Sequence, residues 1–187
     1  MVDLQKQLLS YVPMNEQEEK DRLFMLHCLE KHADVYTRKD PVCHLTASAW
    51  IVNPERTKVL MAYHNIYRSW AWLGGHADGE RDLLGVALRE AREESGLRNV
   101  RPVQEDIYSL EVLTVDGHVK RGQYVSSHLH LNVTYLLEAD EEENLTSKPD
   151  ENSGVSWFAL DDALSACSEP WMRDHIYAKL NEKLRML

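Results

Sequence analysis

Three glutamates at helical spacing lie near the middle of the chain. The segment Arg89-Glu90-Ala91-Arg92-Glu93-Glu94-Ser95-Gly96 places Glu90, Glu93 and Glu94 three and four positions apart. On a helix, such residues share a face, so their carboxylates point toward one small volume. A hard divalent ion such as Mg²⁺, with Mn²⁺ as a substitute, takes oxygen ligands and keeps positions open for water and phosphate. The spacing therefore predicts a metal site on this helix.

The alternative for these glutamates is a solvated acidic helix face. Like charges one helical turn apart destabilise a helix by about 0.2–0.5 kcal/mol per pair. Lysines mixed into the face would relieve that repulsion, yet residues 59–119 contain no lysine. The pattern favours metal binding over a solvated face.

The stretch GGHADGERDLLGVALREAREESGL, residues 74–97, resembles the Nudix box. The box pattern is Gly, five residues, Glu, seven residues, and then Arg-Glu-hydrophobic-x-Glu-Glu-x-Gly-hydrophobic. One position departs from it, because Arg81 stands where the family has its first Glu. We interpret this departure as a rearranged loop that leaves catalysis in place. The fixed positions that match are Gly75, Arg89, Glu90, Ala91, Glu93, Glu94, Gly96 and Leu97.

The resemblance implies hydrolysis of a nucleoside diphosphate linked to a second moiety. Metal ions polarise phosphoryl oxygens and make a coordinated water a usable nucleophile near neutral pH. We expect Glu90, Glu93 and Glu94 to be metal ligands, with one of them orienting or deprotonating the water. The backbone carbonyl of Gly74 or Ala77 would complete the metal shell, as carbonyls of this loop do in the family.

Arg89 is expected to have a different role, since it lies off the metal face of the helix. A guanidinium there would brace the loop through a carboxylate, for which Asp78 and Asp82 are the candidates. Arg89 is therefore predicted to act in the site without binding metal.

A further carboxylate is expected outside the box. Family members often supply a metal ligand or base from the loop before a strand that carries an aromatic residue near its start. Here the strand is VSWF, and Glu151 lies six residues before Trp157. We expect Glu151 to act as the base or as a second-ion ligand, with Asp150 as the next choice. The alternative is an ordinary acidic loop.

Three histidines lie in segments that would line the pocket. His128 and His130 are two apart in an alternating strand and share one face, while His76 follows the glycine pair directly. Such a group binds a transition metal or donates to a substrate phosphate. A polar sheet face with hydrogen-bonded imidazoles is the favoured alternative for His128 and His130. His76 is the stronger substrate-binding candidate because its loop adjoins the glutamates.

Aromatic residues precede the glycine pair. Trp70, with Trp72 and Tyr67, offers a surface on which a nucleotide base would stack. The favoured alternative is packing beside the glycine turn. Trp70 therefore remains a weak substrate-binding candidate.

Composition limits the classes of protein. The chain has 187 residues, 43% of them hydrophobic, and a formal net charge of −10. The size fits one domain with an extension, and the acidic balance argues against a general nucleic-acid binder. No apolar run is long enough to span a bilayer, and the first residues lack a secretory pattern. Cys28, Cys43 and Cys167 form no CxxC pair, which favours reduced thiols and a cytoplasmic location.

The pattern of elements predicts an α/β (α+β) fold, and the resemblance implies the same: a mixed β-sheet between helices. We expect residues 1–40 to form a helical extension packed on a domain of residues 41–187. A homodimer is compatible with this kind of domain. The expected helices are 16–32, 82–95 and 169–185, and the expected strands are 44–52, 58–64, 107–115, 124–138 and 155–160, with a loop over 65–80.

Two functions of different classes remain at this stage. The first is a metal-dependent pyrophosphohydrolase that acts on a small-molecule nucleoside diphosphate derivative. The second is a non-catalytic Nudix-type domain that binds such a derivative without turnover, for which Arg81 is the sequence indication. The complete set of helix carboxylates favours the enzyme.

Overall fold

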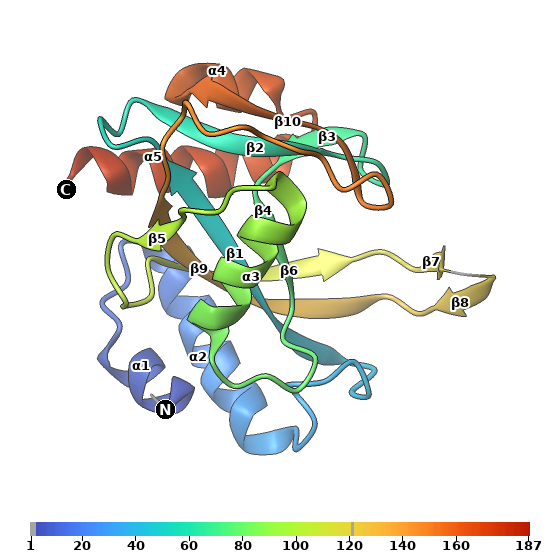
Figure 1. Cartoon of the computed structure of the whole chain (residues 1–187). Coiled ribbons are helices and arrows are strands. Elements are labelled where there is room, and N and C mark those ends of the chain that lie inside the picture. The colour runs from blue at the N-terminus through green and yellow to red at the C-terminus, as the bar shows by residue number, and fades with distance from the viewer. Residues whose placement is uncertain (1–2, 121) are drawn as a thin grey trace.

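An eight-stranded mixed sheet forms the centre of the structure (Figure 1). The structure is a computed structural model, and it describes residues 3–120 and 122–187. The strand order is β10-β2-β1-β9-β5, with β3 beside β2, β4 beside β1 and β6 beside β9. The predicted mixed sheet between helices is confirmed. The strands are β1 (Cys43–Val52), β2 (Lys58–His64), β3 (Ser69–Ala71), β4 (Leu73–His76), β5 (Arg101–Pro102), β6 (Ser109–Val115), β9 (His128–Glu138) and β10 (Asn152–Ala159).

Strands β1 and β9 pair in parallel over ten residues of β1, from Cys43 opposite Leu129 to Val52 opposite Glu138. Every residue of β1 is buried. The first part of β1 alternates between apolar residues on one face and the polar residues His44, Thr46 and Ser48 on the other, and only its last residues are apolar on both faces.

The two faces of β1 pack against different helices. Ala47 and Ala49 belong to a core cluster with α3 (Leu83–Ser95), whereas Trp50 and Val52 belong to a second cluster with the C-terminal helices. Successive residues of a strand point to opposite faces, so α3 and the C-terminal helices cover opposite sides of the sheet. The C-terminal helices are α4 (Leu160–Ala166), the π-helical η1 (Met172–Tyr177) and α5 (Ala178–Arg185).

Helix α3 begins and ends where the sequence predicts. The Asp82 side chain accepts a hydrogen bond from the Gly85 amide at 3.0 Å, and Gly96 takes the left-handed conformation at φ 75°. An N-cap carboxylate satisfies an otherwise unpaired amide, and glycine adopts a positive φ without a Cβ clash. The apolar side of the helix is buried against the sheet together with Glu94, whereas Glu90 and Glu93 are more exposed.

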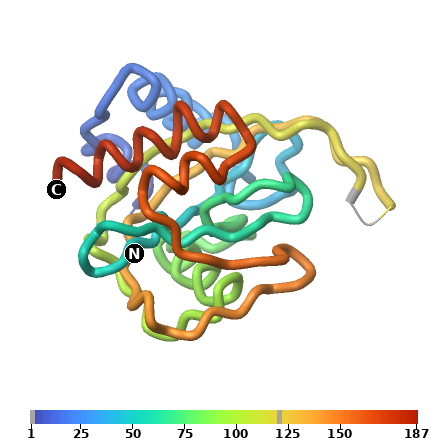
Figure 2. The backbone as a smooth tube through the Cα atoms, turned by 90° about the horizontal axis from the view of Figure 1, so that it is seen from above, coloured from blue at the N-terminus to red at the C-terminus, as the bar shows by residue number. Residues whose placement is uncertain are grey.

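The N-terminal helices are α1 (Leu4–Ser10), which the sequence analysis missed, and α2 (Glu16–Lys31). Helix α2 runs along β6, whose outer edge has no strand partner. Gln17 donates to the Leu110 carbonyl at 3.1 Å, and Asp21 accepts from the Val112 amide at 2.9 Å. These side chains satisfy the exposed edge of the strand. Figure 2 shows α2 beside the C-terminal helix.

Three further expectations were inexact. The expected loop 65–80 contains β3 and β4, and the expected strand 124–138 divides into β8 (Gln123–Val125) and β9. The expected helix 169–185 divides into η1 and α5, and Trp171 near its start is 60% exposed. The β8 strand pairs with β7 (His118–Lys120), and this hairpin protrudes from the domain (Figure 1). Among the described residues, no helix has the length and apolarity needed to cross a membrane.

Candidate metal centre

Three carboxylates from two segments meet at one end of α3. Glu90 and Glu94 of α3 and Glu151 of the loop before β10 offer oxygens that all lie within 4.8 Å of one another. A Cβ added to Gly75 would lie 2.5 Å from the Glu90 carboxyl carbon. Only glycine allows the β4 backbone to approach this carboxylate so closely.

Glu94 is the buried member of the group, with 7% of its surface exposed. The Gly74 amide donates to its carboxylate at 3.1 Å, and the Asn152 side chain donates to its backbone carbonyl at 3.0 Å. Burial and, to a smaller extent, the nearby charges of Glu90 and Glu151 together raise the pKa of Glu94 to about 8, against the lowering effect of the Gly74 hydrogen bond. The site therefore resists a third negative charge unless a cation is present.

Glu93 lies outside this group. Its half-exposed carboxylate faces Lys148 at 3.4 Å, and the same ammonium reaches Glu151 at 3.0 Å. Helical spacing alone treats the three box glutamates alike, whereas the fold brings only two of them together with Glu151. The loop carboxylate completes the group.

The expected partners of Arg89 were wrong. Arg89 contacts Glu90 at 2.9 Å and Glu93 at 3.9 Å rather than Asp78 or Asp82. Asp82 instead caps α3, and Asp78 pairs with Arg38 at 2.6 Å. Arg89 thus holds the outer carboxylates of its own helix.

The box loop is tied to the segment before β1, a contact that the sequence analysis missed. Besides the Arg38–Asp78 pair, the Gly79 amide donates to the Tyr36 carbonyl at 2.8 Å. The Arg81 guanidinium lies over the Tyr36 ring at 4.6 Å from its centroid. Arg81, the departure from the box pattern, therefore joins this attachment, and the interpretation as a rearranged loop stays a prediction.

Comparison with known proteins identifies the family. The sequence matches the NUDIX domain over residues 43–180, which is well over half of the chain. The chain belongs to the Nudix family. No match was found among curated proteins.

Solved Nudix structures share the fold at low sequence identity. An Ap4A hydrolase of C. elegans superposes with a TM-score of 0.55 at 18% identity, over 76% of this chain and 95% of that one. A NUDIX-family hydrolase of Clostridium perfringens gives 0.53 at 21%, over 76% and 97%. The E. coli dihydroneopterin triphosphate pyrophosphohydrolase gives 0.53 at 15%, over 82% and 97%. At such identities the likeness concerns the fold alone.

The backbone of the Nudix box loop is partly engaged. The Gly74 amide holds Glu94, whereas the Ala77 carbonyl accepts from the Glu80 amide at 2.9 Å within a turn. Two backbone carbonyls were expected as metal ligands. The Ala77 carbonyl already accepts a hydrogen bond, which favours the Gly74 carbonyl as the ligand.

The tryptophans before the box pack against aromatic side chains of other segments. Trp70 meets Phe158 edge-on at 4.8 Å and Tyr63 at 5.6 Å between ring centroids. Trp72 meets Tyr177 at 5.6 Å, while Tyr67 is half-exposed beside His64. These contacts favour packing over base stacking for Trp70.

The expected histidines gather around a fourth that the sequence analysis missed. The ring of His44, on β1, lies 5.1 Å from His76, 4.8 Å from His128 and 5.0 Å from His130 between centroids. Burial lowers the pKa of His44, with a further lowering from His128, so its neutral form is favoured. The parallel pairing of β1 with β9 places His44 opposite His130. This pairing was not predictable from the local sequence of either strand.

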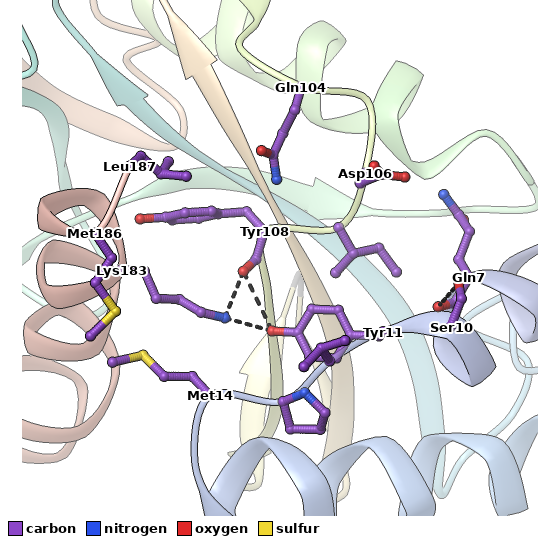
Figure 3. Close-up of a pocket in the computed structure, with 13 residues that line it drawn as sticks. Gln7, Ser10, Tyr11, Met14, Gln104, Asp106, Tyr108, Lys183, Met186 and Leu187 are labelled. Atoms are coloured by element: carbon purple, nitrogen blue, oxygen red, sulfur yellow. Dashed lines mark hydrogen bonds between the residues drawn. The ribbon is translucent and has the colours of Figure 1, made fainter.

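A cavity of about 620 Å³ lies away from these groups, between α1 and the C-terminus (Figure 3). Within its lining, Lys183 donates to the Tyr11 hydroxyl at 2.6 Å and to the Tyr108 carbonyl at 2.7 Å. None of its lining residues belongs to α3 or to the carboxylate group. The cavity and the carboxylate group are therefore separate features of the structure.

Proposed function

We propose that this Nudix protein hydrolyses a diphosphate bond in a nucleoside diphosphate linked to another moiety, with a divalent metal ion. The observation that carries the proposal is the convergence of Glu90, Glu94 and Glu151 within 4.8 Å. Grouped carboxylates beside a glycine-rich strand are suited to hold Mg²⁺ against an anionic phosphate. A small-molecule substrate in the cytoplasm agrees with the acidic charge balance.

The donors fit a hard cation. All three side chains offer oxygen, and the raised pKa of Glu94 marks a position where negative charge is costly without one. Two nearby cationic side chains form ion pairs with the other members of the group: Arg89 pairs with Glu90, and Lys148 pairs with Glu151. A bound Mg²⁺ or Mn²⁺ would draw charge from the phosphoryl oxygens and make a water more acidic.

The residues around the group have distinct proposed roles. Glu90 and Glu94 hold the ion, and the Gly74 amide fixes the orientation of Glu94. Glu151 accepts the proton of the attacking water, and Lys148, at 3.0 Å, positions the Glu151 carboxylate. Arg89 orients Glu90 from the outer side of the helix.

The experiment is a product screen with the full chain. Sugar nucleotides, ADP-ribose, dinucleoside polyphosphates, modified nucleoside triphosphates and coenzyme A are incubated with Mg²⁺ or Mn²⁺, and anion-exchange chromatography resolves the products. The solved relatives whose names include Ap4A and dihydroneopterin triphosphate recommend substrates of both kinds. The Glu94→Gln variant serves as the control.

Cleavage of a phosphoanhydride that requires the metal and Glu94 supports the proposal. Substrates that remain intact while raising the melting temperature would instead identify a binding domain without turnover. A binding domain of this kind would account for Arg81, which stands at the position of the first box glutamate.

A further inference from the structure

A group of imidazoles lies on the face of the sheet opposite α3. His44 of β1 is in register with His130 of β9, and His128, two residues earlier, points to the same face. His76 of β4 pairs with Thr46, whose face His44 shares. Gly75 lies beside Glu90, and because neighbouring strand residues point to opposite faces, His76 and its partners lie across β4 from the carboxylates.

The ring nitrogens are close enough to share one ion. His44, His128 and His130 each offer a nitrogen within 4.8 Å of the others. The Nε2 atoms of His128 and His130 are 3.3 Å apart. Three imidazoles at such separations are a ligand set that suits zinc and its neighbours in the transition series.

The His44 ring is buried, and its nitrogens are not satisfied by hydrogen bonds within the described part of the chain. The residue is 5% exposed, and both of its buried ring nitrogens are without a hydrogen-bonding partner among the described residues. A buried polar group is usually paired, so the favoured alternative, a sheet face of hydrogen-bonded imidazoles, leaves His44 unexplained.

His128 is oriented as a metal ligand would be. Its Nδ1 lies 2.8 Å from the Ser126 carbonyl, which can only accept a hydrogen bond. Nδ1 therefore carries the proton, and in the neutral ring Nε2 presents its lone pair toward His130. A backbone carbonyl that fixes the tautomer in this way is the usual support of a metal-bound histidine.

We propose that His44, His128 and His130 form a transition-metal site for an ion such as Zn²⁺ or Co²⁺, with His76 as the adjacent fourth imidazole. The site is separate from the carboxylate group in both position and chemistry. Mg²⁺ prefers oxygen ligands, so excess Mg²⁺ occupies the carboxylates and leaves the imidazoles available.

One rival group for the same ions must be separated in the test. Cys28, His32 and Cys43 also offer ligand atoms within 4.8 Å of one another. Both thiols are buried, and burial raises the pKa of each, to about 12 for Cys43. Thiolate ligands give Co²⁺ a near-ultraviolet charge-transfer band that imidazole ligands do not.

The experiment is a Co²⁺ titration of the full chain in millimolar Mg²⁺, followed by calorimetry and by the visible spectrum of the ion. The variants are His128→Gln and His130→Gln. The control is His175→Ala, an exposed histidine on η1. A Cys28→Ser/Cys43→Ser variant removes the rival group. Far-ultraviolet circular dichroism verifies that each variant is folded.

We expect wild type, His175→Ala and the cysteine variant to bind Co²⁺ alike, without a thiolate band. Each of the two glutamine variants should weaken binding by at least on the order of tenfold. If a glutamine variant fails to fold, Zn²⁺-induced shifts of the His44, His128 and His130 ring signals in the wild-type NMR spectrum replace it. Absence of Co²⁺ binding, a thiolate band, or equal affinity in folded glutamine variants would overturn the proposal.

Discussion

The structure contains two groups of carboxylates with buried members, and they are compensated differently. Glu18 and Glu111 meet two lysines of the C-terminal helix: Lys179 lies 3.3 Å from Glu18 and 3.0 Å from Glu111, and Lys183 lies 2.6 Å from Glu18. At the Nudix box, Glu90, Glu94 and Glu151 converge, and among the described residues Arg89 pairs with Glu90 and Lys148 pairs with Glu151.

The pKa values of Glu18 and Glu94, one from each group, move in opposite directions. Burial raises the pKa of Glu18, but Lys179 and Lys183 outweigh it and bring the value below the ordinary one. Burial, together with the neighbouring charges of Glu90 and Glu151, raises the pKa of Glu94 to about 8. The first group is compensated by lysines of the chain and connects α2, β6 and α5, whereas we propose that the second group is compensated by a cation from solution.

Among these predictions, replacing the buried Lys179 of the first group should have the largest effect, and the quantity affected is the free energy of unfolding. Lys179→Ala leaves Glu111 and Glu18 buried with one ammonium fewer, and breaking a buried pair in this way costs about 3–5 kcal/mol of unfolding free energy. Urea denaturation measures the loss. The exposed Lys6→Ala is the control and should stay within about 0.5 kcal/mol of wild type. Equal stability of the two variants would remove the distinction between the groups.

Glu94→Gln should abolish most activity while the fold survives. We expect kcat to fall by on the order of a hundredfold, because the buried carboxylate of the metal group is lost. Glu93→Gln is the matched control on the same helix, and its loss should be smaller since Glu93 lies outside the group. Steady-state kinetics at saturating Mg²⁺ decide the comparison, and near wild-type turnover in Glu94→Gln would contradict it.

Glu151→Gln addresses the loop carboxylate. If Glu151 is the base, the variant should lose the acidic limb of the kcat–pH profile together with at least about tenfold in rate. Asp150→Asn, on the neighbouring residue, should keep the profile. An unchanged profile in Glu151→Gln would move the role of base to α3.

Arg81→Glu should have the smallest effect. The substitution restores the usual box residue and removes the contact with Tyr36, so we expect activity within about tenfold of wild type, or 1.4 kcal/mol in the barrier. Arg81→Gln is the control that removes the same contact without adding a charge. A larger gain in Arg81→Glu alone would show that the missing glutamate limits this enzyme.

Local patterns predicted most of the fold, because α2, α3 and the long strands bury regular faces. Helical spacing also predicted Glu90 and Glu94, and the distance to Trp157 predicted Glu151. The pairing of β1 with β9 was not predictable in this way, so His44 was missed. The contacts of Asp78 and Arg81 with residues 36–38 join distant segments, and no local spacing encodes them.

The stability of the metal-free protein as a function of pH tests the account most directly. Because the pKa of Glu94 is raised in the folded state, folding retains a proton that the unfolded chain releases, and stability should fall as pH rises from about 4.5 to 8. We predict a loss on the order of a few kcal/mol in chelator, reversed by Mg²⁺ and absent in Glu94→Gln. A wild-type profile that matches Glu94→Gln and does not respond to Mg²⁺ would contradict the claim that these carboxylates await a cation.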